Sequence, residues 1–116
     1  MPRTAALAAL ALCLCAAPAL AQDGQQLFNL QCSFCHNDDS MGPKLAGVAD
    51  RKIGSTDFEY SAALKAKGEA GATWTDAELD SFLKSPAAHT PGTKMTMSVT
   101  DDANRAAIVA YLKTLK

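Results

Sequence analysis

The stretch Cys32-Ser33-Phe34-Cys35-His36 constrains this chain more than any other. Two thiols three positions apart, followed directly by a histidine, form the C-x-x-C-H pattern at which c-type haem is attached. Each thiol can add to one vinyl group of the same porphyrin, and His36 is then held beneath the iron as an axial ligand. The rest of the chain must therefore supply a second axial ligand and an apolar pocket, and must leave one haem edge open to electrons.

The N-terminal segment, residues 1–21, has the features of a secretory signal peptide. Arg3 gives it a positive start, residues 5–17 are all apolar or small, and Pro18 ends that run. The triplet Ala19-Leu20-Ala21 then matches the small-x-small cleavage pattern. The apolar run is shorter than the roughly 20 residues of a membrane-spanning helix, which argues against a membrane anchor. We therefore predict cleavage after the alanine triplet and a location in the bacterial periplasm.

Cleavage there leaves residues 22–116 as one small domain and removes Cys13 and Cys15. Each of these two cysteines follows a leucine rather than a small residue, which argues against a lipid anchor. Only Cys32 and Cys35 remain, so a disulfide framework or a four-cysteine zinc site cannot form. The formal net charge of the 116-residue chain is −1 and no basic run is present, which argues against nucleic acid as a partner.

Helical patterns and loop patterns alternate over the mature domain, and no convincing strand is found. The predicted helices cover residues 23–31 with Asp23 as cap, residues 58–67 ending before Gly68, a segment begun by the capping box Thr75-Asp76-Ala77-Glu78 and ended by Pro86, and a last segment capped by Thr100-Asp101-Asp102. The predicted loops cover residues 37–57, 68–73 and 87–99. The predicted fold class is all-α.

The cysteine pair could serve two other uses. A thioredoxin-like redox pair also has the C-x-x-C spacing, but it belongs near a βαβ pattern, which this chain lacks. A zinc site could draw on Cys32, Cys35, His36 and His89, but structural zinc sites have paired spacings on both sides. An exported haem protein explains the sequence better than either.

The second axial ligand has several candidates. Met41 lies too close to His36 in sequence to reach the opposite face of a haem. Met95, Met97 and His89 remain, and Met95 lies in a loop stiffened by Pro91, which suits it to close over the iron. Methionines also fill gaps in apolar cores, so the alternative for Met95 and Met97 is a packing role. Metal-bound histidines usually donate their other ring proton to a carbonyl, and Pro43 is a candidate for that acceptor.

Further motifs give the chain a specific resemblance. In chain order they are Gly24 and Phe28 before C-x-x-C-H, the G-P-x-L-x-G loop at residues 42–47 with Arg51 after it, Phe58-Glu59-Tyr60, the series Trp74, Leu79, Phe82-Leu83 and Pro86, the segment Pro91-Gly92-Thr93-Lys94-Met95, and Tyr111-Leu112-Lys113. With these motifs the chain resembles the small class I cytochromes c of mitochondria and the bacterial periplasm. The resemblance covers nearly all of residues 22–116.

The resemblance implies a small cytochrome c fold, in which the N- and C-terminal helices cross while short helices and loops wrap around one haem. It implies that Cys32 and Cys35 hold that haem c as thioethers. It also implies that His36 and Met95 ligate the iron, and that the carbonyl of Pro43 fixes His36. It further implies that the haem propionates are surrounded or hydrogen-bonded by Arg51, Tyr60, Ser61, Trp74 and Thr93. Gly24 and Phe28 would let the first helix cross the last.

Some positions depart from the family pattern. Phe82 stands where a tyrosine often reaches the methionine sulfur, and Met97 replaces an aromatic residue. The mitochondrial relatives carry a ring of lysines around the haem edge, whereas here Gln31, Ala87 and Ala88 occupy matching positions and Lys94 remains. Electrostatic steering of partners by a basic face is therefore expected to be weak.

The sequence thus predicts a monohaem electron carrier rather than an enzyme. Its expected partners are redox proteins that dock transiently at the exposed haem edge, and it is expected to be a monomer without stable membrane insertion. Two alternatives remain at this point. One is a haem subunit of a larger oxidoreductase, and the other is an open-site haem enzyme or sensor, such as a peroxidase or a gas-binding module.

Overall fold

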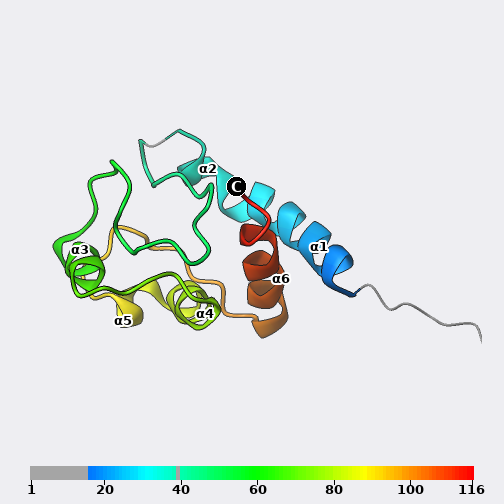
Figure 1. Cartoon of the computed structure of the whole chain (residues 1–116). Coiled ribbons are helices and arrows are strands. Elements are labelled where there is room, and N and C mark those ends of the chain that lie inside the picture. The colour runs from blue at the N-terminus through cyan, green and yellow to red at the C-terminus, as the bar shows by residue number, and fades with distance from the viewer. Residues whose placement is uncertain (1–15, 39) are drawn as a thin grey trace, which may run out of the picture.

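The computed structural model describes residues 16–38 and 40–116 (Figure 1). Its helices are α1 (Ala16–Gln31), α2 (Ser33–His36), α3 (Ala62–Glu69), α4 (Asp76–Lys84), α5 (Pro86–His89) and α6 (Asp102–Leu112). Within the described ranges no strand forms, and Lys52 and Thr73 make an isolated antiparallel bridge. The predicted all-α class is confirmed. None of the described helices is long and apolar enough to span a bilayer.

The first and last helices form the largest helix–helix interface and cross one another (Figure 1). Gly24 makes this crossing possible, because a Cβ added there would lie only 1.9 Å from the carbonyl oxygen of Ala107. One turn further along α1, the ring of Phe28 meets the ring of Tyr111 edge-on, with 5.2 Å between centroids. The crossing therefore combines a glycine notch with an aromatic pair.

Helix α1 begins earlier than the sequence pattern predicts. It starts at Ala16, so Asp23 lies inside the helix and not at its cap. Pro18 lies in the first turn, where its missing N–H removes no helical hydrogen bond. Residues 1–15 lie outside the described residues, and residues 16–21 form the beginning of α1. The predicted signal peptide and its cleavage point therefore stay predictions.

Two other segments were predicted with the wrong bounds. Helix α3 starts at Ala62, after Ser61 as cap, and it continues through Gly68 to Glu69. Gly68 does not end the helix; it admits the backbone of Ile53, whose carbonyl oxygen would lie 1.9 Å from an added Cβ. The predicted loop 87–99 also begins with the single turn of α5, because Ser85 caps it and Pro86 occupies its first position.

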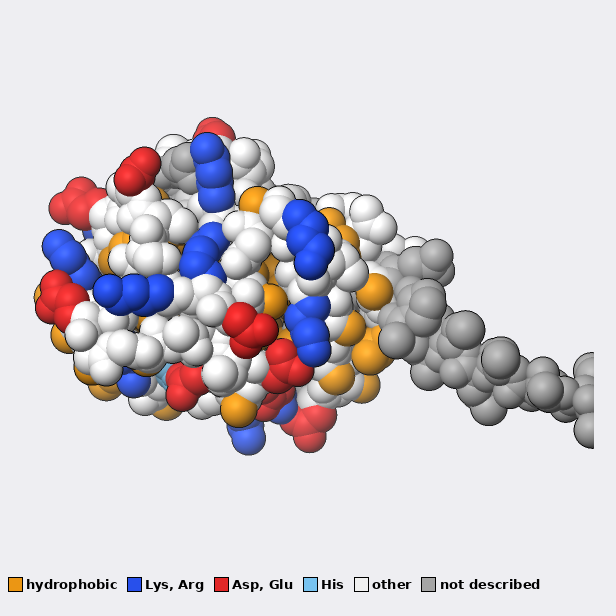
Figure 2. Space-filling view, viewed as in Figure 1, with side chains coloured by type: hydrophobic (Ala, Val, Ile, Leu, Met, Phe, Trp, Pro, Cys, Tyr) orange, Lys and Arg blue, Asp and Glu red, His pale blue; other side chains and the backbone are white. Residues whose placement is uncertain are grey.

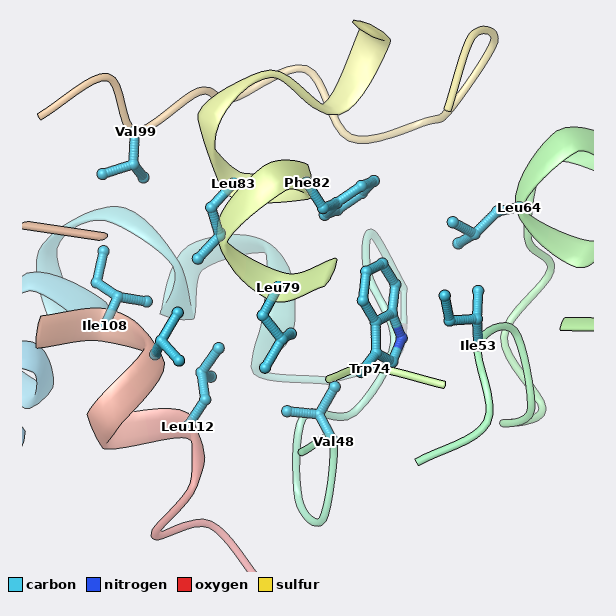
Figure 3. Close-up of a cluster of buried hydrophobic side chains, with 11 residues drawn as sticks. Val48, Ile53, Leu64, Trp74, Leu79, Phe82, Leu83, Val99, Ile108 and Leu112 are labelled. Carbon is cyan, nitrogen blue, oxygen red and sulfur yellow. The ribbon is translucent and has the colours of Figure 1, made fainter. Parts of the chain in front are cut away.

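A continuous apolar core joins α6, α4 and the segment before α3 (Figure 3). Ile108 is fully buried, and α4 adds Leu79, Phe82 and Leu83. Trp74 packs beside Phe82 with 5.0 Å between ring centroids. Ile53 and Leu64 continue the core on the far side of the indole (Figure 3). Residues of the candidate site lie against this core.

A buried arginine connects α6 to α4 and to the loop between α5 and α6. The guanidinium of Arg105 donates to Asp80 Oδ1 at 2.9 Å and to the carbonyls of Val99 and Thr100, each at 3.0 Å. It also pairs with Asp102. The hydrogen bonds to Asp80 and then to Asp102 raise the pKa of Arg105 above its usual value. Arg105 therefore holds the C-terminal end of that loop with a charge that does not titrate.

Candidate haem site

Cys35 lies on α2, and Cys32 is the residue between α1 and α2. Cys32 N donates to Phe28 O at 2.8 Å, and His36 N donates back to Cys32 O at 3.2 Å. Both thiols are free and partly exposed. Burial, and to a lesser degree the neighbouring Cys35, raises the pKa of the Cys32 thiol, so this thiol is protonated at neutral pH. Two accessible thiols one turn apart fit attachment to a single porphyrin.

The imidazole of His36 is fixed by the loop that follows it. Its Nδ1 lies 2.8 Å from the carbonyl oxygen of Pro43. A proline carbonyl can only accept, so Nδ1 carries the proton and Nε2 keeps the lone pair that a metal needs. The ring also packs on Gly42, where an added Cβ would lie 2.8 Å from His36 Cε1. The sequence-predicted pair of His36 and Pro43 is therefore brought together with the ring in a ligating tautomer.

Met95 follows a tight turn. Thr93 N donates to Thr90 O at 3.0 Å, and Gly92 between them has φ +85°. With Pro91 at the second turn position, this is a type II turn, which requires glycine at its third position. Met95 N then lies 3.5 Å from Thr93 Oγ1, and the Met95 side chain packs partly buried against the core. Thr93 is thus placed at the base of the methionine segment.

The other candidate ligands are placed differently. Met41 is 57% exposed and Met97 is 44% exposed. His89 is buried against Trp74 and Phe82, and its two ring nitrogens face Glu78 and Thr90. Both nitrogens are therefore engaged. No group of three or more His, Cys, Asp and Glu side chains that could hold a metal ion occurs in the part of the chain described, so the zinc alternative finds no support.

An open cavity of about 580 Å³ lies beside Lys94, the residue before Met95. Its lining is Ser40, Met41, Lys44, Ala46, Arg51, Thr56, Asp57, Phe58, Glu59 and Lys94. Arg51 donates to the carbonyls of Lys44 and Ala46, each at 3.0 Å. Its Nε is buried and has no hydrogen-bond partner among the described residues. A buried cationic donor without an acceptor at a cavity fits an anionic group, such as a haem propionate.

The remaining predicted propionate residues have structural partners of their own. Tyr60 shares its hydroxyl with Thr56, a contact that sequence reasoning missed because nothing marks one polar loop residue among several. Ser61 caps α3, accepting from Leu64 N at 3.2 Å, and a serine before a helix does carry that signal. Trp74 is buried in the core.

A helical chain with two thiols, an oriented imidazole, a partly buried methionine and a cavity at Arg51 defines the class of c-type haem proteins. Comparison with known proteins narrows the class. Residues 21–116 match the family model for Cytochrome c. Cytochrome c of Tetrahymena pyriformis is 41% identical over 99 residues, covering 82% of this chain and 88% of the relative. Cytochrome c2 of Rhodopseudomonas palustris is 37% identical over 113 residues, covering 83% and 98%.

A solved structure supports the same family. The ferricytochrome c2 of Rhodopseudomonas palustris has a TM-score of 0.74 at 38% identity, with 83% of this chain and 98% of that chain covered. The chain belongs to the cytochrome c family. Its cofactor is one haem c, bound covalently through Cys32 and Cys35, and its function is electron transfer.

Proposed function

We propose that the mature chain is a periplasmic carrier of single electrons, with His36 and Met95 as the axial ligands. The observation that carries this proposal is the combination of an oriented imidazole at His36 with a partly buried Met95, while Met41 and Met97 point to solvent. Both axial positions are then filled by protein, so no substrate binds at the iron. This favours a carrier over an open-site enzyme or sensor.

When bound, haem c supplies an iron that cycles between Fe(II) and Fe(III). The protein's own residues set the conditions for that cycle. The carbonyl of Pro43 holds the His36 ring and raises its basicity. The soft sulfur of Met95 stabilises the reduced metal, and an apolar surrounding disfavours the extra charge of the oxidised one. We therefore expect a positive midpoint potential, and a clearly negative value in a redox titration would contradict this assignment.

The ligand assignment is tested by two matched substitutions. Ferric haem with a methionine ligand has a weak near-infrared band that arises from the sulfur–iron bond. Met95→Ala should remove this band, whereas Met97→Ala should retain it. Loss of the band in Met97→Ala with retention in Met95→Ala would reverse the assignment.

Carbon monoxide gives a second test, because a firmly bound methionine keeps it off the reduced iron. We expect slow and incomplete binding to the wild-type protein at neutral pH and fast binding to Met95→Ala. Fast binding to the wild-type protein would favour the open-site alternative, a peroxidase or gas sensor. For the oxidoreductase-subunit alternative, gel filtration from the native host decides, and elution as a monomer supports a free carrier.

The haem edge is the docking surface in this proposal. Among the described residues the exposed large apolar side chains are Leu20, Leu30, Phe34, Met41 and Met97. All except Leu20 lie within two residues of Cys32, Cys35, Pro43 or Met95 in the sequence. Redox proteins that dock here would therefore meet an apolar rim. The contact is transient, because a carrier must release each partner.

Export supports the same role. Relatives named cytochrome c2 come from bacteria, and the first 21 residues have the pattern of a signal peptide. N-terminal sequencing of protein purified from the native host should begin at Gln22. A chain that keeps residues 1–21 would argue for a tethered protein instead.

A further inference from the structure

Three thioether side chains occur among the described residues, and their exposure to solvent differs. Met41 is 57% exposed and Met97 is 44% exposed, whereas Met95 is partly buried against the core. A thioether is readily oxidised to a sulfoxide, and the oxidant must reach a lone pair of the sulfur. Solvent access therefore ranks Met41 and Met97 above Met95 as sites of oxidation.

The exposure of Met97 is fixed by contacts on both sides of it. Two residues later, Val99 is buried, and its carbonyl accepts from Arg105 Nη1 at 3.0 Å. Three residues earlier, Lys94 Nζ donates to Glu59 O at 2.6 Å. Met97 therefore lies in a short segment that is anchored at both ends, and its sulfur is accessible without any opening of that segment.

Met41 is likewise exposed between anchored neighbours. Before it, Ser40 N donates to Asp38 Oδ1 at 3.1 Å. After it, Gly42 is buried against the ring of His36. The side chain of Met41 lines the open cavity of about 580 Å³, which small solutes can enter from solvent. Its sulfur is therefore accessible on the folded protein.

We propose that Met41 and Met97 are oxidised by hydrogen peroxide before Met95, and that they thereby protect the sulfur of Met95. This inference rests on the proposed ligation by Met95, because a sulfur bound to iron has a lone pair engaged in that bond. Each peroxide molecule that an exposed thioether consumes is lost to the ligand. The protection therefore operates while peroxide is limiting.

The reaction requires only the thioether and the peroxide. A sulfur lone pair attacks one peroxide oxygen, so that an S–O bond forms and the O–O bond breaks. The proton of the attacked oxygen passes to the departing oxygen, which leaves as water. The sulfur loses two electrons and the peroxide gains them. Methionine sulfoxide reductases reverse such an oxidation, so the class of reaction that renews these two sites is sulfoxide reduction.

The test adds hydrogen peroxide in substoichiometric steps to the mature ferric protein with haem attached. Peptide mapping by mass spectrometry gives the sulfoxide fraction at each methionine, and fragment spectra separate Met95 from Met97. We expect sulfoxide at Met41 and Met97 at doses that leave Met95 intact and the near-infrared sulfur–iron band at full intensity. Oxidation of Met95 at the same dose as the other two, or at a lower one, would overturn the proposal.

A double variant tests the protection itself. Met41→Leu combined with Met97→Leu removes both exposed sulfurs and keeps apolar side chains of similar volume, an exchange that proteins tolerate well. In this variant, Met95 should be oxidised and the band should decrease at a several-fold lower dose of peroxide than in the wild type. Loss of Met95 at the same dose as in the wild type would show that the exposed sulfurs do not protect it.

Leu30→Met in the double variant is the matched control. Leu30 is 82% exposed, so the substitution returns one accessible thioether at a different position. It should restore part of the protection, which a purely structural effect of the two leucines would not allow. Failure to restore any protection would assign the earlier loss of Met95 to altered packing and would overturn the proposal.

The band measured before any peroxide is added separates this inference from the proposed function. A wild-type protein that lacks the band at the start would overturn the ligation by Met95. A band that is present at the start and disappears before sulfoxide forms at Met41 and Met97 would overturn only the protective role of these two residues.

Discussion

At the scale of single residues, the site depends on a glycine without a side chain as much as on the side chains that it contains. Gly42 has no side chain, and this leaves room for the ring of His36, whose Cε1 and Nδ1 would lie 2.8 and 2.9 Å from an added Cβ. Contacts under 3.0 Å of this kind cannot be accommodated without movement. The glycine therefore sets the depth at which the imidazole lies.

We predict that Gly42→Ala displaces His36 from Pro43. Overpacking of this kind costs about 1–3 kcal/mol of stability, so the melting temperature should fall by several degrees. The haem should remain covalently attached, because both cysteines are untouched, and a denaturing gel stained for haem checks this. The His36 ring resonances in the reduced protein should shift.

Gly47→Ala is the control for this prediction. Gly47 lies in the same loop at φ +71°, and no atom lies within 4 Å of an added Cβ. That substitution should strain the backbone but leave the His36 resonances in place. Equal displacement of His36 in both variants would contradict the role of Gly42.

The attachment of haem at Cys32 and Cys35 could be predicted from sequence, because its chemistry is tied to a fixed spacing, whereas the ligand roles of His36 and Met95 stay predictions. Cys32, Cys35 and His36 follow one another within a single turn, and Met95 follows the turn of Pro91 and Gly92. The engagement of His89 could not be predicted in this way. Its partners Trp74 and Glu78 lie 15 and 11 positions earlier, and only the packing of α4 brings them together.

At the scale of helices, the strongest constraint is the approach of α1 to α6 at Gly24. Alanine is a better helix former than glycine by about 1 kcal/mol, which alone would make Gly24→Ala stabilising. The added Cβ, however, would lie 1.9 Å from the backbone oxygen of Ala107. Backbone cannot rotate away as a side chain can, so the two helices would have to separate.

We therefore predict that Gly24→Ala destabilises the protein by at least about 1–3 kcal/mol, the usual cost of overpacking. Separation of the helices also weakens the edge-on contact of Phe28 with Tyr111. Chemical denaturation of the oxidised protein measures the change. Gln25→Ala, an exposed neighbour on α1, should have little effect, and a stabilised Gly24→Ala would show that the helices can move apart at no cost.

Helix boundaries were predictable where a local capping signal exists. Thr75 and Asp101 cap α4 and α6 as their side chains suggest, and Pro86 does end α4. The start of α1 was missed because Asp23 looks like a cap although alanine-rich sequence before it continues the helix. The end of α3 was missed because Gly68 serves the approach of Ile53, and such a distant contact leaves no local pattern.

At the scale of the whole molecule, the distribution of charge is mixed. Acidic and basic side chains are interspersed on the face shown in Figure 2. Lys94, the remaining lysine of the family's ring, donates to Glu59 O at 2.6 Å and lies 5.7 Å above the ring of Phe58. Its charge is therefore held against the protein and is poorly placed to steer a partner. Exposed large apolar side chains stand close in sequence to the cysteine pair, Pro43 and Met95, namely Leu30, Phe34, Met41 and Met97.

We predict that electron exchange at the haem edge depends little on salt. Voltammetry on gold with hydroxyl- and methyl-terminated layers should give a reversible response that survives at about 1 M salt, where the Debye length is only about 3 Å. Phe34→Gln should reduce this response, because Phe34 is 77% exposed between the two cysteines. Ala66→Gln on α3 is the control and should leave it unchanged. A response confined to carboxylate-terminated layers and abolished by salt would instead indicate a basic docking face.

The pairing of α1 with α6 also bears on when the chain can fold. Helix α1 leaves a ribosome or a translocation pore well before its main partner, residues 102–112. Until those residues emerge, the notch at Gly24 and the ring of Phe28 have nothing to pack against, and closing so long a loop costs chain entropy. In an unfinished chain, Cys32 and Cys35 therefore follow a helix that has no packing partner. The order of emergence delays the docking of α1 until residues 102–112 have emerged.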